Sequence, residues 1–214
     1  MSQTKSLQLE DFIPTRYSLL SRLQDWNDQE SWKEFFDTYW RLIYSVALKS
    51  GLTDAEAQDV VQETIISVAK DIHKFKRDRR LGSFKGWLRN LTRWRIADQL
   101  RKRTRAESMP MEKLADDPEE LGWREFPESA EERSDWEAEW RANLAKVALE
   151  NVKRRIKEEH FQIFDLFVVR QWPAAKVARV LSVSTGQVYL VKFRVAALVK
   201  MEVLRLERSD LPFL

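Results

Sequence analysis

Apolar residues recur along most of this chain at three- and four-residue spacing, which is the period of an amphipathic helix. Polar residues fill the positions between them, so each such segment predicts a helix with one face in a core. In the N-terminal half three of these stripes follow one another. Their members are Trp32, Phe35, Phe36, Tyr39, Ile43, Val46 and Ala47; then Ala57, Val60, Val61, Ile65, Val68 and Ile72; then Phe84, Leu88, Leu91, Ile96 and Leu100.

Local signals predict where these helices begin and end. The first stripe stops near Gly51, and Thr53 with Glu56 three residues later forms a capping box that predicts the start of the second helix. Ser83 predicts the cap of the third helix, which runs through about residue 103. The segment from 73 to 84, HKFKRDRRLGSF, keeps no period and predicts a loop.

The C-terminal half continues the helical pattern and adds a motif. One helix is predicted to start at Trp136, and a second carries a run of large apolar residues from 161 to 168. Pro173 then suits the first turn of a short helix, and Ser184 with Gln187 caps a long one. A short helix, a tight turn and a capped longer helix predict a helix-turn-helix.

Composition agrees with an all-α fold class. Only 5 Gly and 6 Pro occur in 214 residues, too few for a turn-dense β-sandwich. No run approaches the roughly 20 apolar residues of a membrane span, and the start, MSQTKSLQLEDF, lacks the apolar core of a signal peptide. We therefore expect a cytoplasmic protein. The absence of Cys excludes disulfides, thiolate zinc sites and a cysteine nucleophile.

Charge is strongly segregated along the chain. Residues 70–105 carry 14 basic and 3 acidic side chains, whereas residues 106–139 carry 3 basic and 13 acidic ones. The basic block suits a polyanion. The acidic block contains three prolines and predicts a linker, for which a solvated tether and a nucleic-acid mimic both remain open. The predicted organisation is an N-terminal extension (1–25), a helical domain (26–105), an acidic linker (106–135), a helix-turn-helix domain (136–208) and a tail (209–214).

Nothing in the sequence resembles a catalytic site. There are only two histidines, and no Gly-rich phosphate loop occurs. Asp59 and Glu63 lie one helical turn apart, but two carboxylates without supporting ligands predict no metal site. We expect neither an enzyme nor a cofactor nor a small-molecule substrate. Together with Gln62, the two carboxylates instead form a polar patch suited to a basic partner.

Aromatic residues lie among the cations of the basic block. Rings between cations can stack on unpaired bases while the cations contact phosphates. Phe84 falls on the apolar stripe of its helix and Trp87 lies close to it, so Phe75 and Trp94 are the better candidates for exposed contacts.

Three runs, in this order and spacing, are similar to a known family. They are AEAQDVVQETIISVAKDI, FKGWLRNLTRWRIADQLRKR and WPAAKVARVLSVSTGQVYLVKFRV. Together they resemble a bacterial extracytoplasmic-function sigma factor over about residues 30–105 and 136–206. The resemblance implies two partners, core RNA polymerase through its β′ clamp and its β subunit, and promoter DNA. It also makes an anti-sigma factor a candidate partner.

The resemblance implies three groups of contact residues. Asp59, Gln62 and Glu63 would dock on the β′ clamp helices. The minus-ten element would be recognised and opened by the predicted loop and the helix after it, and the minus-thirty-five element by the helix after Ser184. The residues implied for the minus-ten element are Phe75, Lys76, Arg77, Arg79, Arg80, Lys85, Trp87, Arg89, Arg93 and Trp94, and those for the minus-thirty-five element are Ser184, Gln187, Tyr189, Lys192 and Arg194.

The recognition helix differs from the family pattern. Family members usually carry several basic residues along this helix, where this chain has Tyr189, Leu190, Val191, Ala196 and Ala197. An apolar strip there suits a protein partner better than duplex DNA. Two other functions therefore stay open, a stand-alone helix-turn-helix regulator and a protein-binding adaptor without DNA readout.

Overall fold

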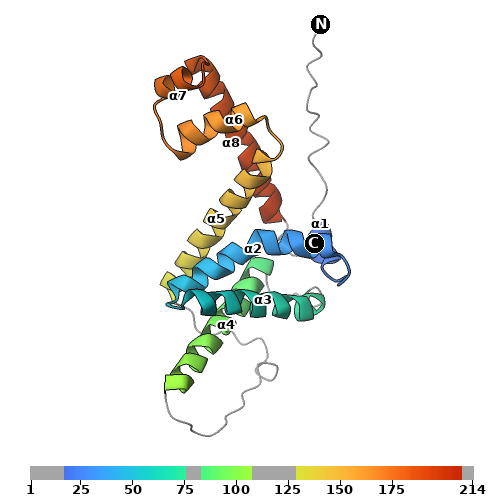
Figure 1. Ribbon diagram of the computed structural model, residues 1–214. Helices are drawn as coiled ribbons and strands as arrows, with labels where there is room; N and C mark the ends of the chain where they lie inside the picture. Colours follow the sequence, from blue (N-terminus) through green and yellow to red (C-terminus); the bar gives the residue numbers. More distant parts are fainter. Residues whose placement is uncertain (1–16, 76–82, 108–128, 209–214) are drawn as a thin grey trace.

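The computed structural model describes residues 17–75, 83–107 and 129–208, and every regular element in these ranges is helical (Figure 1). The predicted all-α fold is therefore confirmed. No helix in these ranges has the length and apolarity that a membrane span requires. In chain order the elements are α1 (Tyr17–Arg22), α2 (Gln29–Lys49), α3 (Asp54–Phe75), α4 (Phe84–Glu107), α5 (Ala130–Lys153), α6 (Glu158–Phe164), the π-helical turn η3 (Asp165–Val169), α7 (Ala174–Val180) and α8 (Thr185–Arg208).

Helix α2 ends where the sequence predicts, in a glycine-dependent turn. Gly51 has a φ of 83°, a left-handed conformation that favours glycine. Its N–H donates to the Leu48 carbonyl at 3.0 Å, and the Leu52 N–H donates to the Ala47 carbonyl at 3.3 Å. These two bonds form a Schellman motif, which satisfies carbonyls at the helix end. Leu52 is buried beside the turn, so the chain reverses directly into α3.

The predicted caps of α3 and α4 are confirmed. The Thr53 N–H donates to the Glu56 carboxylate at 2.7 Å, and the Glu56 N–H donates to the Thr53 hydroxyl at 3.4 Å, which closes the capping box. The Ser83 hydroxyl accepts from the Gly86 N–H at 3.2 Å. Helix α3 extends to Phe75, so the first three residues of the predicted loop 73–84 are helical.

Helix α5 begins earlier than its apolar stripe suggests. Ser129 and Glu132 form a complete capping box, and the helix starts at Ala130 rather than at Trp136. The last residues of the predicted linker, 130–135, are therefore the first turns of α5. The rest of that linker between 108 and 128 lies outside the described residues.

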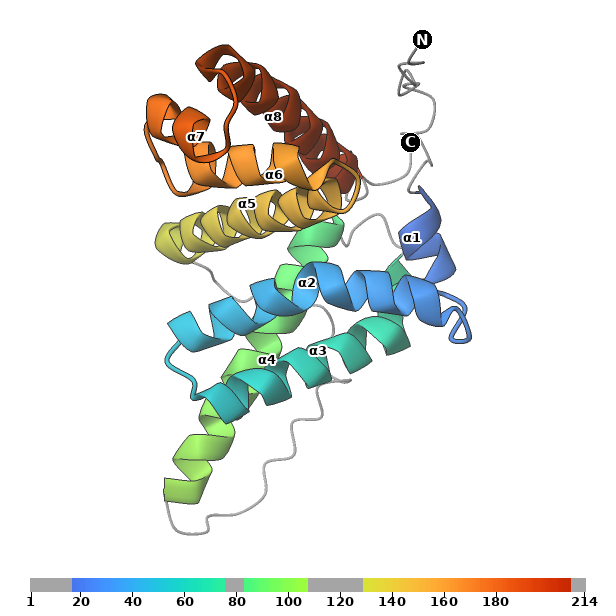
Figure 2. The ribbon, with the colours of Figure 1, turned by 45° about the horizontal axis from the view of Figure 1, so that its top comes forward.

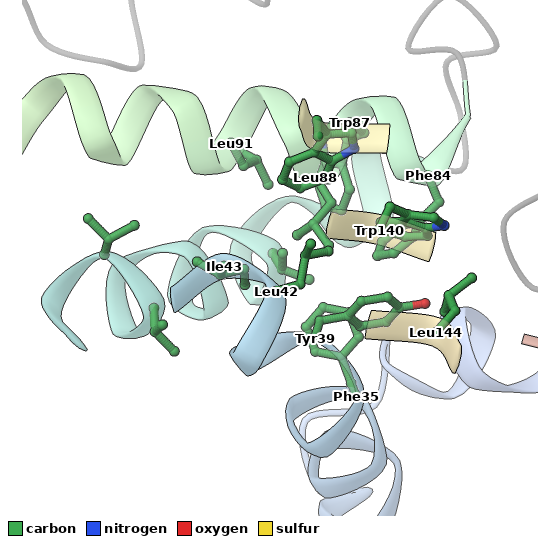
Figure 3. Packing of buried hydrophobic residues seen from close by; sticks show 14 of the residues in the cluster. Phe35, Tyr39, Leu42, Ile43, Phe84, Trp87, Leu88, Leu91, Trp140 and Leu144 are labelled. Carbon is green, nitrogen blue, oxygen red and sulfur yellow. The ribbon is translucent and has the colours of Figure 1, made fainter. Parts of the chain in front are cut away.

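The main core is formed by α1 to α4, the first half of α5 and the end of α8. Its centre is aromatic (Figure 3). Tyr39 of α2 lies 5.5 Å from Phe84 of α4 and 5.5 Å from Trp140 of α5, measured between ring centroids, and its ring is stacked on Trp140 at 26°. Because stacked and edge-to-face rings add to the energy of apolar burial, this cluster ties α5 to the first three long helices.

A second core lies between the end of α5, α6, α7 and α8. Its fully buried members include Ile163, Val177 and Val188, one from each of the three later helices. Helix α5 thus contributes to both cores, with α2 on one side of it and α6 and α8 on the other (Figure 2).

The short helix α1 lies within the predicted N-terminal extension. Leu19, Leu20 and Leu23 are buried in the main core. Six helical residues are too few to show a helical period. Nothing in the pattern of residues 1–25 therefore predicted this helix.

Candidate functional site

The polar patch on α3 lies on the surface opposite the apolar stripe. Asp59 and Gln62 are exposed, as predicted, and Glu63 is half-buried. Val60, Val61 and Thr64, on the other side of the helix, are buried in the main core. The surface of α3 therefore offers one free carboxylate and one amide to a partner.

Helix α4 lies alongside α3 and partly neutralises Glu63, the third residue of the patch. Lys102 Nζ lies 3.0 Å from one Glu63 carboxylate oxygen, and Arg95 Nη1 lies 4.0 Å from the other. Arg95 also donates to the Ser67 hydroxyl at 2.7 Å. Glu63 therefore joins two helices, and the docking role implied for it is shared with this structural one.

A second set of contacts between the two helices holds the start of α3 against the end of α4. Arg103 Nε donates to Glu56 at 2.9 Å, and Arg103 Nη1 donates to the Gly51 carbonyl at 3.2 Å. Hydrogen bonds from Arg103 and then from the Thr53 backbone and hydroxyl lower the pKa of Glu56 to about 2, from an ordinary value of 4.5. Arg103 and Lys102 thus pair with carboxylates of α3 within the fold.

The residues implied for the minus-ten element lie in different environments. Lys76, Arg77, Arg79 and Arg80 lie outside the described residues, and Phe75 is the last residue of α3. Trp87 is 1% exposed, with its ring centroid 5.8 Å from that of Phe84. A direct DNA contact by Trp87 is therefore wrong, because its indole fills the centre of the main core.

Four other predicted residues, Lys85, Arg89, Arg93 and Trp94, gather on α4 and are half-buried. Side chains of α5 contact two of them. Lys85 Nζ pairs with Glu137 of α5 and lies 5.6 Å from the centroid of the Trp140 ring. Arg93 Nη2 lies 3.3 Å from Glu132 of α5.

A third ion pair connects α5 to α2. Lys49 Nζ pairs with Glu139, which also accepts from the Ser45 hydroxyl at 2.7 Å. The hydrogen bond from Lys49, followed by that from Ser45, lowers the pKa of the Glu139 carboxyl despite its burial. The Asn143 side-chain amide, also on α5, donates to the Thr38 carbonyl at 2.8 Å in a buried position. These α5 partners were not predicted, and no local pattern indicates them, because they depend on contacts between segments about 90 to 105 residues apart.

A cleft of about 630 Å³ lies beside these ion pairs, between α4, α5 and α2. Arg89, Arg93 and Trp94 line it from α4, and Glu132 and Trp136 line it from α5. The face of α4 that carries the predicted DNA-contacting residues is therefore covered by α5 without being fully packed against it.

Around Pro173 and Ser184, where a helix-turn-helix is predicted, the structure has α7, a four-residue turn and α8. Pro173 precedes α7 as its N-cap residue. Ser182 in the turn has a φ of 55°, and the Val183 N–H donates to the Ala178 carbonyl at 3.0 Å. The Ser184 hydroxyl accepts from the Gln187 N–H at 3.1 Å and caps α8.

The outer face at the start of α8 is aromatic and apolar. Tyr189 and Leu190 are each 48% exposed, and Phe193 is 67% exposed. Val191, which we expected in this strip, is buried in the second core, whereas Phe193 was missed. The predicted apolar strip is therefore exposed, but it contains Phe193 instead of Val191.

The polar residues predicted for this helix surround that face. Arg194 is exposed and Gln187 is half-buried. Lys192 Nζ lies 5.6 Å from the ring centroid of Phe167 and 5.7 Å from that of Phe193. The Tyr189 ring packs edge-on against Phe167 at 5.4 Å. Two cations are thus available near the apolar face, fewer than in the usual family pattern.

Among the described residues, no three His, Cys, Asp or Glu side chains come together in a way that could hold a metal ion. The arrangement offers surfaces for binding, which are a carboxylate and an amide on α3, a covered basic and aromatic face on α4, and an exposed apolar face on α8.

Comparison with known proteins finds one matching family. Residues 35–106, from the second turn of α2 to the last turn of α4, match the family described as sigma-70 region 2. No curated protein matches the chain.

Proposed function

We propose that this chain is a sigma-70 family factor that directs core RNA polymerase to specific promoters, because residues 35–106 match the family model of sigma-70 region 2. Region 2 is the part of a sigma factor that binds core polymerase and recognises the minus-ten element. The observation that carries the proposal is that the matched residues coincide with the α2–α4 unit, which bears both the α3 patch and the basic face of α4. Such a protein has no active site, because the polymerase performs all bond formation. It would work in the cytoplasm.

The exposed positions on α3 support polymerase docking. Asp59 and Gln62 protrude from a helix whose opposite face is fixed in the main core, so they are presented rigidly. A carboxylate on a rigid helix suits a basic helical partner such as the β′ clamp. Glu63 supports this surface mainly by joining α3 to α4.

The basic block supports promoter recognition. Four cations between residues 76 and 80 lead into α4, which adds Lys85, Arg89, Arg93 and Trp94. Cations and an aromatic ring along one helix suit the phosphates and unstacked bases of a melted strand. We infer that these residues recognise and open the minus-ten element.

The second domain would place the start of α8 against the minus-thirty-five element. The residues we assign to this contact are Ser184, Gln187, Tyr189, Lys192 and Arg194. The exposed Leu190 and Phe193 favour a protein contact at the same end of the helix. An anti-sigma factor or a polymerase subunit would suit this face. We assign the chain to the extracytoplasmic-function group, because its sequence resembles that group over about residues 30–105 and 136–206.

A reconstitution separates this function from its alternatives. Purified chain is mixed with core polymerase and a promoter library, and transcript starts are sequenced. A promoter-specificity factor gives defined start sites only when both proteins are present. Duplex binding without polymerase, together with no start-site selection, would instead indicate a stand-alone regulator. Polymerase binding without any selection would indicate an adaptor.

The docking surface has a sharper test. We expect the Asp59→Lys, Gln62→Lys variant to lose about tenfold or more in affinity for core polymerase, because like charges across an interface repel. The matched control is Glu150→Lys, Gln162→Lys, at exposed positions of α5 and α6. Affinity is measured by fluorescence anisotropy and folding by circular dichroism. Equal affinity of the two variants would contradict the assignment of this surface.

A further inference from the structure

The cleft between α2, α4 and α5 has walls that are fixed by the rest of the fold. Ile96 of α4 and Trp136 of α5 line it, and they are only 7% and 3% exposed because both also belong to the main core. Farther along α5, Trp140 is stacked on Tyr39 of α2 at an interplanar angle of 26°. With a volume of about 630 Å³, the cleft lies in the size range of sites for small molecules. It is therefore preformed and is present without any movement of α5.

Apolar side chains form much of the lining of the cleft. Val46 lines it from α2, Ala97 and Leu100 line it from α4, and the indoles of Trp94 and Trp136 belong to the lining as well. Leu100 is 37% exposed and Trp94 is half-buried, so both have surface that a ligand would remove from water. Burial of apolar surface favours binding, and indole rings favour an aromatic neighbour. The lining therefore suits a ligand with an apolar, aromatic body.

One end of the cleft carries an excess of negative charge. Lys49 of α2 pairs with Glu139 of α5, and Asp135, one turn earlier on α5, also lines the cleft. The hydrogen bond and charge of Glu139, and then the charge of Asp135, raise the pKa of Lys49 above its ordinary value, so both carboxylates act on the same ammonium group. Two carboxylates against one ammonium group leave a net charge of −1 among the residues that line this end.

The other end carries an excess of positive charge. Arg89 and Arg93, one turn apart on α4, both line the cleft, and Arg93 Nη2 lies 3.3 Å from Glu132 of α5. Two guanidinium groups against one carboxylate leave a net charge of +1 among the residues that line this end. Glu132 and Glu139 are seven residues apart on α5, so the two ends are about 10 Å apart at 1.5 Å per residue. The cleft is therefore polarised along its length.

We infer that this cleft binds a small zwitterion whose ammonium and acidic groups are separated by an apolar, aromatic body, as in a short apolar peptide with free ends. The ammonium group contacts Asp135, the acidic group contacts Arg89 and Arg93, and the body lies along Trp94 and Ala97. A free α-amino acid is too short to do this, because its two charged groups share one carbon atom. The inference goes beyond the proposed function and does not rest on it.

The first test varies the charges of the ligand and keeps its body. Leucyl-phenylalanine, a zwitterion, is compared with its N-acetyl form, its C-terminal amide and the doubly blocked form, which are an anion, a cation and a neutral molecule. Calorimetry on the full chain is done without DNA, because Arg93 and Trp94 are also assigned to the promoter. We expect the zwitterion to bind at a single site and at least about fivefold more tightly than either singly charged form, because each free end adds a contact with partly exposed charges.

The second test fills the cleft. Ala97→Phe adds a ring to a half-buried residue of the lining. We expect the affinity for leucyl-phenylalanine to fall at least about tenfold, because the ring takes up volume that the body of the ligand needs. The matched control, Ala138→Phe, adds the same ring at an exposed position of α5 outside the lining and should bind the dipeptide like the wild type. Circular dichroism checks that both variants fold.

The third test removes a charge at an exposed position, where folding is insensitive to substitution. Asp135→Asn takes away the carboxylate that is proposed to meet the ammonium group. We expect about a fivefold loss, so that the zwitterion binds this variant as weakly as the N-acetyl form binds the wild type. Glu150→Gln, also at an exposed position of α5 and outside the lining, removes the same charge and should keep the wild-type preference for the zwitterion.

Several results would overturn the inference. Equal affinity for all four forms would do so, since an apolar body would then suffice, and so would the absence of binding up to about 5 mM. Unchanged affinity in Ala97→Phe or in Asp135→Asn would place the ligand elsewhere on the chain and would also overturn it. If Ala97→Phe does not fold, Asp135→Asn decides by itself. Neither polymerase nor promoter enters these measurements, so a negative result leaves the proposed function intact.

Discussion

At the start of α3, the Glu56 carboxylate serves three tasks. It completes a capping box with Thr53, pairs with Arg103 of α4, and thereby holds the turn at Gly51 against the end of α4. Each bond favours the ionised carboxylate, which is why its pKa falls to about 2. The residue therefore links the stability of this corner to pH.

The sign of that link follows from the depressed pKa. The stabilisation is complete above 4.5, the ordinary value, and is lost as the pH falls from there to about 2. We expect the free energy of unfolding of the wild type to fall more steeply across this window than that of Glu56→Gln. Urea unfolding at a series of pH values measures the difference. Parallel curves would show that the carboxylate gains nothing from its partners.

Glu202 of α8 is a second acidic residue with a structural role. It is 4% exposed, accepts from Asn151 of α5 at 2.8 Å and from Arg205 Nε at 2.8 Å, and lies 3.6 Å from Arg155. Burial by itself raises the pKa of the carboxyl, but the bonds from Arg205 and Asn151 and the charge of Arg155 outweigh it and hold the pKa below its ordinary value.

Removing this carboxylate takes a buried acceptor away from Asn151, Arg205 and Arg155. We expect Glu202→Ala to lower the free energy of unfolding by about 3 kcal/mol, in the range for breaking a buried pair. Glu207→Ala, at an exposed position of the same helix, should change it by less than about 0.5 kcal/mol. Chemical denaturation of both variants gives the comparison. Similar losses in the two would contradict the role assigned to Glu202.

At the scale of single helices, the start of α8 has one face packed in the second core and one face exposed to solvent. Leu190→Ser with Phe193→Ser should change the free energy of unfolding by less than about 1 kcal/mol, because both side chains are largely exposed. Val191→Ser, between them on the packed face, should cost more than about 2 kcal/mol, since it buries a hydroxyl in the second core. Thermal unfolding distinguishes the two, and a large loss in the double variant would mean that the strip is packed.

Helical period and caps predicted most elements correctly, for physical reasons that also explain the misses. The stripe from Ala57 to Ile72 and the Thr53 cap are local features, and the structure confirms both. Helix α1 depends on Leu19 and Leu20, which with Leu23 just after the helix are buried by packing in the main core, so its signal is tertiary. The π-helical turn η3 is closed by the Asp165–Arg170 pair, a contact that no period of the sequence predicts.

The functional surfaces were predictable where they depend on local sequence and not where they depend on packing between distant segments. The identity of the basic and acidic residues follows from the sequence, and exposure of Asp59 and Gln62 follows from their place opposite a stripe. The cover that α5 forms over Lys85 and Arg93 does not, because it depends on how two segments more than 35 residues apart pack together. Trp87 shows the same limit, as its burial is decided by neighbouring helices.

For the whole molecule, sharing α5 between two cores predicts coupled unfolding. We expect tryptophan fluorescence and far-ultraviolet circular dichroism to report a single, coincident urea transition. Trp140→Ala should lower the free energy of unfolding by about 3–5 kcal/mol, as for other large aromatic truncations, and should separate the two signals. Two resolved transitions in the wild type would show that the cores are independent.

Helix α8 spans both cores as one continuous rod. Val188 and Val195 anchor its first half in the second core, and Leu206 anchors its last turn in the main core. At 1.5 Å per residue, its 24 residues extend about 36 Å. A partner that binds at Phe193 and tilts this end of α8 therefore also moves Leu206 within the main core. Because coupling between two sites is reciprocal, a change that weakens the packing of Leu206 also alters the affinity of the partner at Phe193.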